Sequence, residues 1–155
     1  MARLIVDGLA GLRALAGSPI PPTEWLAVDQ DRVDAFAACT GDAQWIHVDI
    51  DRARTSRYRG TIVHGYLTLA LIPLLWHEHM DVRGIGMAIN LGLDRVRFPA
   101  PLLVGTRIRA HFLILQVDEK QHGLRVVSRA TIEAESGSTP VCVADLVTLY
   151  RAMTS

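Results

Sequence analysis

The most apolar segment of the chain is GTIVHGYLTLALIPLLWHEHM, which is hydrophobic on nearly every side for about four helical turns. This pattern predicts a helix that is buried on all of its faces rather than along one stripe. Pro73 lies inside it and is expected to kink the helix or to end its regular hydrogen bonding. The run from Ile62 to Trp76 is interrupted by His64 and is shorter than the roughly 20 residues of a membrane span. We therefore expect a buried helix in a soluble protein.

Extended segments follow the helix, and their sequences are MAINLGLDRVRF, TRIRAHFLILQV, LRVVSRATIEAE and PVCVADLVTLY. The second and third alternate in part between apolar and charged residues, which is typical of strands with one wet and one packed face. These elements predict an α+β fold in which a sheet wraps around the helix. Such a sheet leaves edge strands, and pairing two sheets across a twofold axis hides them, so we expect a homodimer.

The residues before the helix complete a single domain that spans 1–155, a length that can bury a full core. Residues 1–22 are expected to form a leading helix that stops near Gly17, followed by a loop. EWLAVD then predicts a short strand. Asp29 is a candidate N-cap for the next helix, and Gly41 suits the position just past its end. That helix delivers Asp42 onto a loop.

Charge and cysteine content narrow the possible partners. The sixteen basic residues balance the sixteen acidic ones, so the broad positive field that nucleic acid or an anionic membrane requires is absent. Arg52, Arg54, Arg57 and Arg59 form the most positive short stretch. The two cysteines lack the spacing of a zinc site or a redox pair, and the charged N-terminus makes a poor signal peptide. A cytoplasmic protein with reduced thiols is expected.

The stretch TGDAQWIHVD carries the first candidate chemistry, because Asp42 and His47 can share one water molecule and divide its protons. The structural alternative is that Asp42 caps a turn and His47 is a surface loop residue. Gln44 and Trp45 lie between them, and such side chains suit the lining of a cleft better than contact with solvent.

TIVHGYL carries the second candidate, because a glycine that begins a buried helix leaves its N–H free to polarise a carbonyl. Gly65 could equally be needed only for close packing. His64 could be a ligand or an acid, or a histidine satisfied by hydrogen bonds at the helix entry. His77 and His79 lack the spacing of metal ligands on one helical face, so no metal is expected. Asp145, in an apolar strand, requires a hydrogen bond or an arginine partner.

FAACTGDAQWIHVD, followed by GTIVHGYLTLALIPLL and INLGLDRVRFPAPLLVGTRIRA, resembles the MaoC-like dehydratases, the (R)-specific enoyl-CoA hydratase group, and most of all their short nodulation protein N-like members. The resemblance runs from Trp25 over most of the chain. It implies a hot-dog fold, in which an antiparallel sheet wraps around a long buried central helix. It also implies a lyase of fatty acid metabolism that needs no cofactor and interconverts trans-2-enoyl and (R)-3-hydroxyacyl thioesters by reversible syn addition of water.

In that resemblance the catalytic aspartate and histidine fall on Asp42 and His47, and the glycine that binds the thioester oxygen falls on Gly65. The substrate would be an acyl thioester of coenzyme A or of a carrier protein, in contact with Gln44, Trp45, His64 and Arg97. The family usually has Asn-Pro where this chain has Gln44-Trp45, which reshapes the expected acyl pocket.

Two other functions of hot-dog folds remain open at this level, an acyl-CoA thioesterase and a non-catalytic acyl-thioester binding module. A binding module would have no need of Asp42, His47 and Gly65. For the phosphates of the carrier, the cluster from Arg52 to Arg59 is one candidate, with Arg95 or Arg97 as competitors. Charge runs of this kind are also commonly just solvated.

Overall fold

The computed structural model describes residues 3–121 and 123–153 of the chain. Its elements, in chain order, are β1 (Leu4–Asp7), α1 (Gly8–Ala14), β2 (Leu26–Ala27), α2 (Gln30–Thr40), α3 (Trp45–Val48), α4 (Ile50–Arg54), α5 (Gly65–Ala70), α6 (Ile72–His79), β3 (Met80–Arg83), β4 (Ile85–Arg97), β5 (Arg107–Lys120), β6 (Gly123–Ala134) and β7 (Cys142–Ala152).

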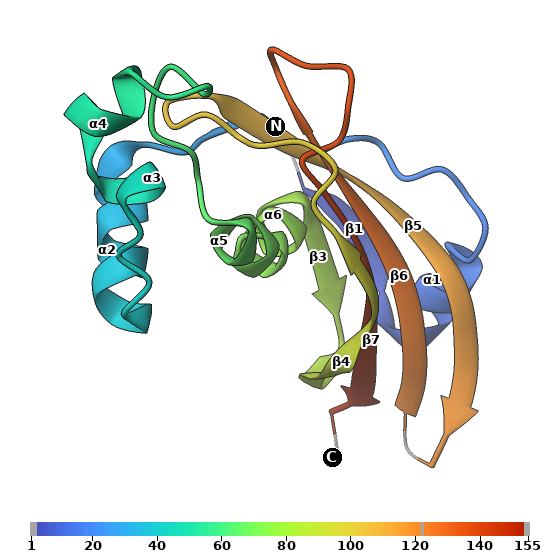
Figure 1. Cartoon of the computed structure of the whole chain (residues 1–155). Coiled ribbons are helices and arrows are strands. Elements are labelled where there is room, and N and C mark those ends of the chain that lie inside the picture. The colour runs from blue at the N-terminus through green and yellow to red at the C-terminus, as the bar shows by residue number, and fades with distance from the viewer. Residues whose placement is uncertain (1–2, 122, 154–155) are drawn as a thin grey trace.

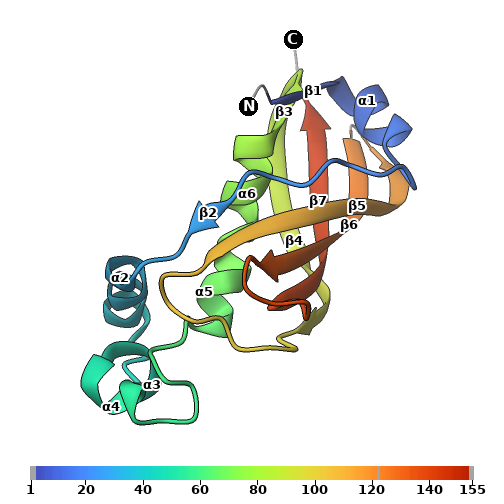
Figure 2. The same ribbon diagram turned by 90° about the horizontal axis from the view of Figure 1, so that it is seen from above.

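A curled antiparallel sheet with strand order β2-β5-β6-β7-β4 forms the main layer of the molecule. Figures 1 and 2 show it bending around the α5–α6 helix, while α2, α3 and α4 lie together beyond the N-terminal end of α5. Strands β1 and β3 form a separate parallel pair. The predicted α+β fold, a sheet wrapped around a central helix, is therefore confirmed.

The central helix is divided in two at Leu71, just before Pro73, as expected from the missing N–H of proline. Ile72 and Leu75 are almost completely buried against the sheet, and the Trp76 ring packs edge-on to Phe112 at 4.9 Å between ring centroids. Fully burying side chains of this size stabilises the fold by about 1.5–3 kcal/mol each. The helix is therefore the centre of the core.

Two details of the sequence prediction are wrong. The helix is not buried on every side, because Tyr66 in its first turn is 70% exposed. The leading helix begins only at Gly8, since Leu4–Asp7 pairs in parallel with β3 and residues inside a strand ladder cannot also be helical. By contrast, α2 has the predicted ends, because the Asp29 carboxylate accepts a hydrogen bond from the Arg32 N–H and Gly41 is left-handed.

Strand β4 stands at one end of the sheet and is exposed along nearly its whole length, unlike β6 and β7. Its exposed apolar residues are Met87, Ile89, Leu91 and Leu93. Long apolar edges of this kind are prone to pair with another strand. Among the described residues, no helix is both long enough and apolar enough to cross a membrane.

Asp145 finds the arginine partner that its apolar strand required. Nε and Nη2 of Arg129 donate to the two carboxylate oxygens of Asp145 at 2.7 and 2.8 Å, and the two residues are directly paired on β6 and β7. Their neighbours Ala130 and Ala144 are fully buried, so the alternation of side chains places the ion pair on the face away from the helix. The Arg129 hydrogen bond holds the pKa of Asp145 below its ordinary value.

We predict that Asp145→Asn lowers the free energy of unfolding at pH 7 by about 1 kcal/mol, since it weakens a charge-assisted pair that water partly reaches. The stabilisation by the Asp145 carboxylate is complete above the ordinary Asp pKa of 3.8. It is lost as the pH falls through the lower pKa that Asp145 has in the folded protein, so below that pH wild type and variant should have the same free energy of unfolding. Urea unfolding over this pH range measures the effect. Asp51→Asn, in a fully exposed pair with Arg54, is the control and should change nothing. If wild type and Asp145→Asn differ in free energy of unfolding by the same amount down to acid pH, the Asp145 carboxylate is not the source of the stabilisation.

Candidate active site

The loop between α2 and α3 carries the candidate acid and base. Gly41 adopts φ 79°, a left-handed conformation that ends α2 and turns the chain, and Asp42 follows with its side chain half exposed. His47 lies one turn further on in the short helix α3 and is only 7% exposed. The two segments thus bring an accessible carboxylate and a buried imidazole to the same place.

Hydrogen bonding determines which nitrogen of His47 is free. Its Nδ1 lies 2.6 Å from the backbone carbonyl oxygen of Ile62, and a carbonyl only accepts, so Nδ1 carries the hydrogen. Nε2 therefore keeps its lone pair. Burial lowers the pKa of His47 below its usual value against the opposing effect of the Ile62 bond, and the neighbouring His64 lowers it further. A neutral imidazole with a free Nε2 is the form that a general base needs.

Gln30, at the start of α2, bonds to the backbone of His47, while Ile62 bonds to its ring. Its amide nitrogen donates to the His47 carbonyl oxygen at 2.8 Å, and its amide oxygen accepts from the Thr61 hydroxyl at 2.7 Å. Gln30 could not be recognised from the sequence, because its partners lie 17 and 31 residues away and no local pattern marks such contacts.

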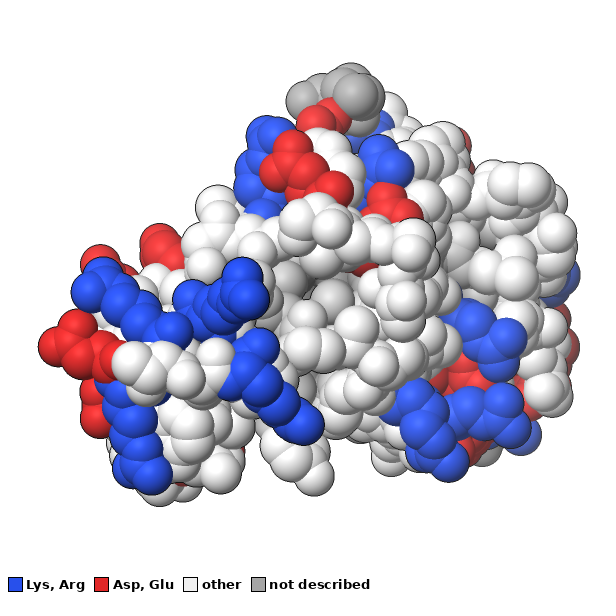
Figure 3. Space-filling model, turned by 45° about the horizontal axis from the view of Figure 1, so that its top comes forward, with Lys and Arg blue, Asp and Glu red and all other residues white. Residues whose placement is uncertain are grey.

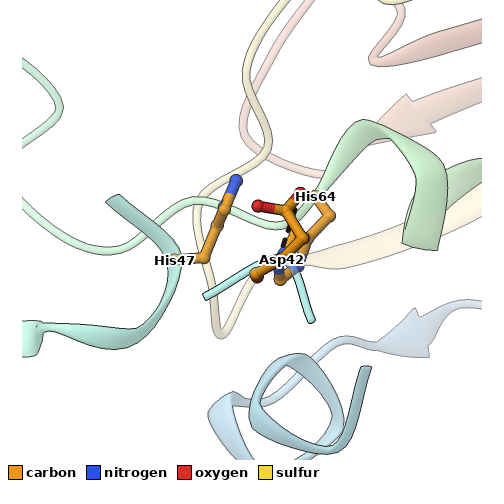
Figure 4. A group of neighbouring side chains, drawn as sticks. All are labelled: Asp42, His47 and His64. Atoms are coloured by element: carbon orange, nitrogen blue, oxygen red, sulfur yellow. Dashed lines mark hydrogen bonds and ion pairs between the residues drawn. The ribbon is translucent and has the colours of Figure 1, made fainter. Parts of the chain in front are cut away.

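His64 lies directly beside the pair. Its ring is stacked on that of His47, with 3.7 Å between centroids and 25° between planes, and its Nε2 lies 2.8 Å from the Asp42 backbone oxygen. The same nitrogen lies 4.0 Å from the Asp42 carboxylate, and Figure 4 shows these two side chains together, with His47 reaching in from α3. Asp42, His47 and His64 each place one potential ligand atom within 4.8 Å of the others.

These three side chains have the composition of a metal site, but their geometry is unsuited to one. Nitrogen lone pairs lie in the plane of an imidazole ring, and two rings stacked nearly parallel at 3.7 Å cannot both direct a lone pair at one ion. His64 Nε2 also already donates to a carbonyl oxygen. The geometry instead suits proton transfer.

Gly65 is the first residue of α5, so its N–H has no acceptor within the helix. It lines a hollow of about 320 Å³ together with His47. The ring of Phe98 packs so closely over Gly65 that a Cβ there would lie 3.0 Å from it. Tight packing under Phe98 therefore explains why glycine stands here, while the use of its N–H to bind a thioester oxygen stays a prediction.

The rest of the hollow is formed by residues that the sequence analysis did not single out, namely Tyr58, Ile62, Val63, Thr68, Phe98, Pro99, Ala100, Pro101, Leu102 and Val141. Half of them come from the segment FPAPL after β4, whose contact with Gly65 arises only on folding. The walls are mainly apolar, which suits the acyl part of a ligand better than a charged group.

The other predicted substrate contacts lie outside this lining. Gln44 is exposed at the start of α3, and Trp45 lies beneath the guanidinium of Arg52, 4.3 Å from its ring centroid. Arg97 donates to the carbonyl of Val96. His64 is 1% exposed and is also not part of the lining. Of the seven predicted residues, the structure gathers Asp42, His47, His64 and Gly65.

The arginines differ in their partners. Several on the sheet face carboxylates, as Arg107 does with Glu135, Arg109 with Glu133 and Arg129 with Asp145. Within the described residues, Arg52, Arg57 and Arg59 form no ion pair, although Arg57 lies over the ring of Tyr58, which lines the hollow. Figure 3 shows basic side chains gathered at the end of the molecule that carries α2–α4.

Over residues 13–136 the sequence matches the family described as MaoC like domain. The chain belongs to the MaoC-like family. It is 42% identical to 3-hydroxyacyl-thioester dehydratase Z of Mycobacterium tuberculosis, over 94% of this chain and 97% of that one. It is 36% identical to nodulation protein N of Rhizobium leguminosarum bv. viciae, over 92% and 91% of the two chains.

Solved structures support the MaoC-like fold. The (R)-hydratase from A. caviae involved in PHA biosynthesis has a TM-score of 0.70 at 23% identity, covering 86% of this chain and 94% of that one. The monoamine oxidase regulatory protein from Archaeoglobus has a TM-score of 0.77 at 20% identity, covering 99% and 100%. At these identities the likeness concerns the fold, and the hot-dog architecture expected of a MaoC-like protein is confirmed.

Proposed function

We propose that this MaoC-like protein catalyses the reversible syn addition of water to trans-2-enoyl thioesters, giving (R)-3-hydroxyacyl thioesters. The observation that carries the proposal is that His47, whose Nδ1 is bonded to Ile62 and whose Nε2 is free, lines one apolar-walled hollow together with Gly65 at the start of α5. A base and an electrophile facing one cavity are the two groups that hydration of a conjugated thioester requires. The 42% identity to a protein named 3-hydroxyacyl-thioester dehydratase supports the same reaction.

In the proposed mechanism, Asp42 and His47 hold one water molecule between them, and His47 Nε2 accepts a proton as the water oxygen attacks C3. Negative charge then moves onto the thioester oxygen, where the Gly65 N–H stabilises it. A proton returned to C2 completes the addition, so one O–H bond of water and the π bond between C2 and C3 are replaced by a C–O bond at C3 and a C–H bond at C2. Side chains and a backbone amide supply every group in this scheme, and we propose no cofactor.

We predict that the purified protein removes the enoyl-thioester absorbance of crotonyl-CoA without releasing free thiol. Asp42→Asn and His47→Gln should each lower kcat by roughly 100-fold or more, because each removes a group that transfers protons. His111→Gln is the matched control, since this histidine pairs with Glu133 on the sheet. Thiol release would instead identify a thioesterase. Absence of both signals, with longer enoyl chains as well, would identify a binding module.

We further propose that the carrier is coenzyme A and that arginines of the Arg52–Arg59 segment bind its phosphates. The support is that Arg57 and Arg59 flank Tyr58 at the hollow, and that neither has an acidic partner in the described structure. Guanidinium groups without carboxylate partners remain available to bind phosphate. Arg97 is a competitor, since it precedes Phe98 in the same lining, but its guanidinium already donates to the Val96 carbonyl.

Arg57→Ala should raise the KM for crotonyl-CoA about tenfold and leave kcat unchanged, as expected for loss of a charged contact made equally in the ground and transition states. The KM for crotonyl-pantetheine, which lacks the nucleotide phosphates, should not change. Arg54→Ala is the control within the same segment, because Arg54 already pairs with Asp51. Equal KM increases for both substrates would mean that Arg57 shapes the hollow rather than binding phosphate.

We also propose a homodimer in which β4 of one copy pairs with β4 of another. The free edge and the four exposed apolar residues of β4 support it, since such a strand is otherwise an aggregation hazard. A twofold axis beside the edge would satisfy both strands at once.

The free thiols of Cys39 and Cys142 support a location in the reducing cytoplasm.

Sedimentation equilibrium should give twice the chain mass of 17.0 kDa for the wild type. Leu93→Lys should shift the protein toward monomer, because the twofold axis brings two buried ammonium groups close together. Ile50→Lys, the same change at a comparably exposed residue of α4, should leave the dimer intact. A wild type that sediments as a single chain would rule out the dimer.

A further inference from the structure

His64 is the most buried of the four gathered site residues that carry chemistry, yet the proposed mechanism leaves it without a role. Its ring is 1% exposed and does not line the hollow. Nε2 donates to the Asp42 backbone oxygen, and Nδ1 is buried without a hydrogen-bond partner among the described residues. At 1% exposure this ring has almost no surface to offer a substrate, and its buried polar atoms need another explanation.

The hydrogen bonds around His64 join two segments that are far apart in sequence. His64 donates to the carbonyl of Asp42, while His47 donates to the carbonyl of Ile62. The Ile62 N–H in turn donates to the carbonyl of Ile46 at 3.0 Å. The loop that carries the acid and base is thus tied at both of its ends to the segment that leads into α5. The ring-to-ring stack lies between these ties.

We propose that His64 is a positioning residue: its Nε2–H holds the Asp42 backbone at a set distance from Gly65, and its ring is the surface on which the His47 ring is stacked. This inference rests on the proposed function. His64 is covalently joined to Gly65, so a bond from its ring to Asp42 links the acid directly to the electrophile. Displacements of about 1 Å in such an arrangement cost as much as 100-fold in rate.

The stack also affects the charge state of the base. The titratable groups that face the His47 ring are His64, at 3.7 Å between ring centroids, and the carboxylate of Asp42. Two stacked imidazoles disfavour a second positive charge, and the pKa of His47 is lowered mainly by burial, with a further contribution from His64. Replacing His64 by an uncharged side chain should therefore raise the pKa of His47.

A matched pair of variants separates the hydrogen bond to Asp42 from the stacking on the His47 ring. In His64→Gln the amide nitrogen can reach the position of the imidazole Nε2 and donate to Asp42, whereas in His64→Asn the same amide is one methylene too short. We expect His64→Asn to lower kcat for crotonyl-CoA by roughly 10- to 100-fold with KM within about twofold. His64→Gln should recover most of that loss. Thermal unfolding of both proteins checks that they fold alike.

NMR titration of the His47 ring provides a readout that does not depend on activity. The midpoint should lie below the ordinary value of 6.5 in the wild type and should move upward in both variants. Equal kcat losses in the two variants, an increase in KM, or an unmoved midpoint would each overturn the proposal. If the wild type hydrates no enoyl thioester, the proposed function fails, and the NMR midpoints still decide whether His64 controls His47.

Discussion

Burial of the α5–α6 helix inside the curl of the sheet is the constraint on which the rest of the molecule depends. The inner residues of β5, β6 and β7, such as Ile114, Ala130 and Ala144, are fully buried against it. Because apolar surface must leave water, the sheet bends around the helix rather than lying flat. The N-terminal end of the helix is thereby held at Gly65, next to the loop of Asp42 and His47.

The site is held together by bonds from side chains to backbone rather than by the reacting groups themselves. His47, His64 and Gln30 each use one polar atom on a distant carbonyl oxygen, which satisfies buried groups and sets their orientation. This division leaves His47 Nε2 free. The same bonds determine which ring nitrogen carries the donated hydrogen, so ring orientation and tautomer are established together.

The balanced net charge of the chain hides an uneven arrangement of its arginines. On the outer side of the sheet, carboxylates such as Glu133 and Asp145 neutralise guanidinium groups across neighbouring strands. Near the hollow, Arg52 and Arg57 lie over aromatic rings instead. Stacking of this kind orients a guanidinium without neutralising it, so these two groups keep an unpaired positive charge.

Local sequence determined those features whose physical cause is local. The caps of α2 at Asp29 and Gly41 and the break of the central helix just before Pro73 follow from contacts within a few residues. Apolar patterns also marked the long strands along the chain, but not their order in the sheet. The candidates Asp42, His47 and Gly65 also came from the sequence, through spacing and through resemblance to the MaoC-like family. Only the tertiary structure decided that Phe98 covers Gly65, that Gln30 holds His47, and that His64 bonds to Asp42 across 22 residues. These contacts join residues far apart in the chain, and the buried helix alone brings them together, so no periodicity or spacing could have marked them.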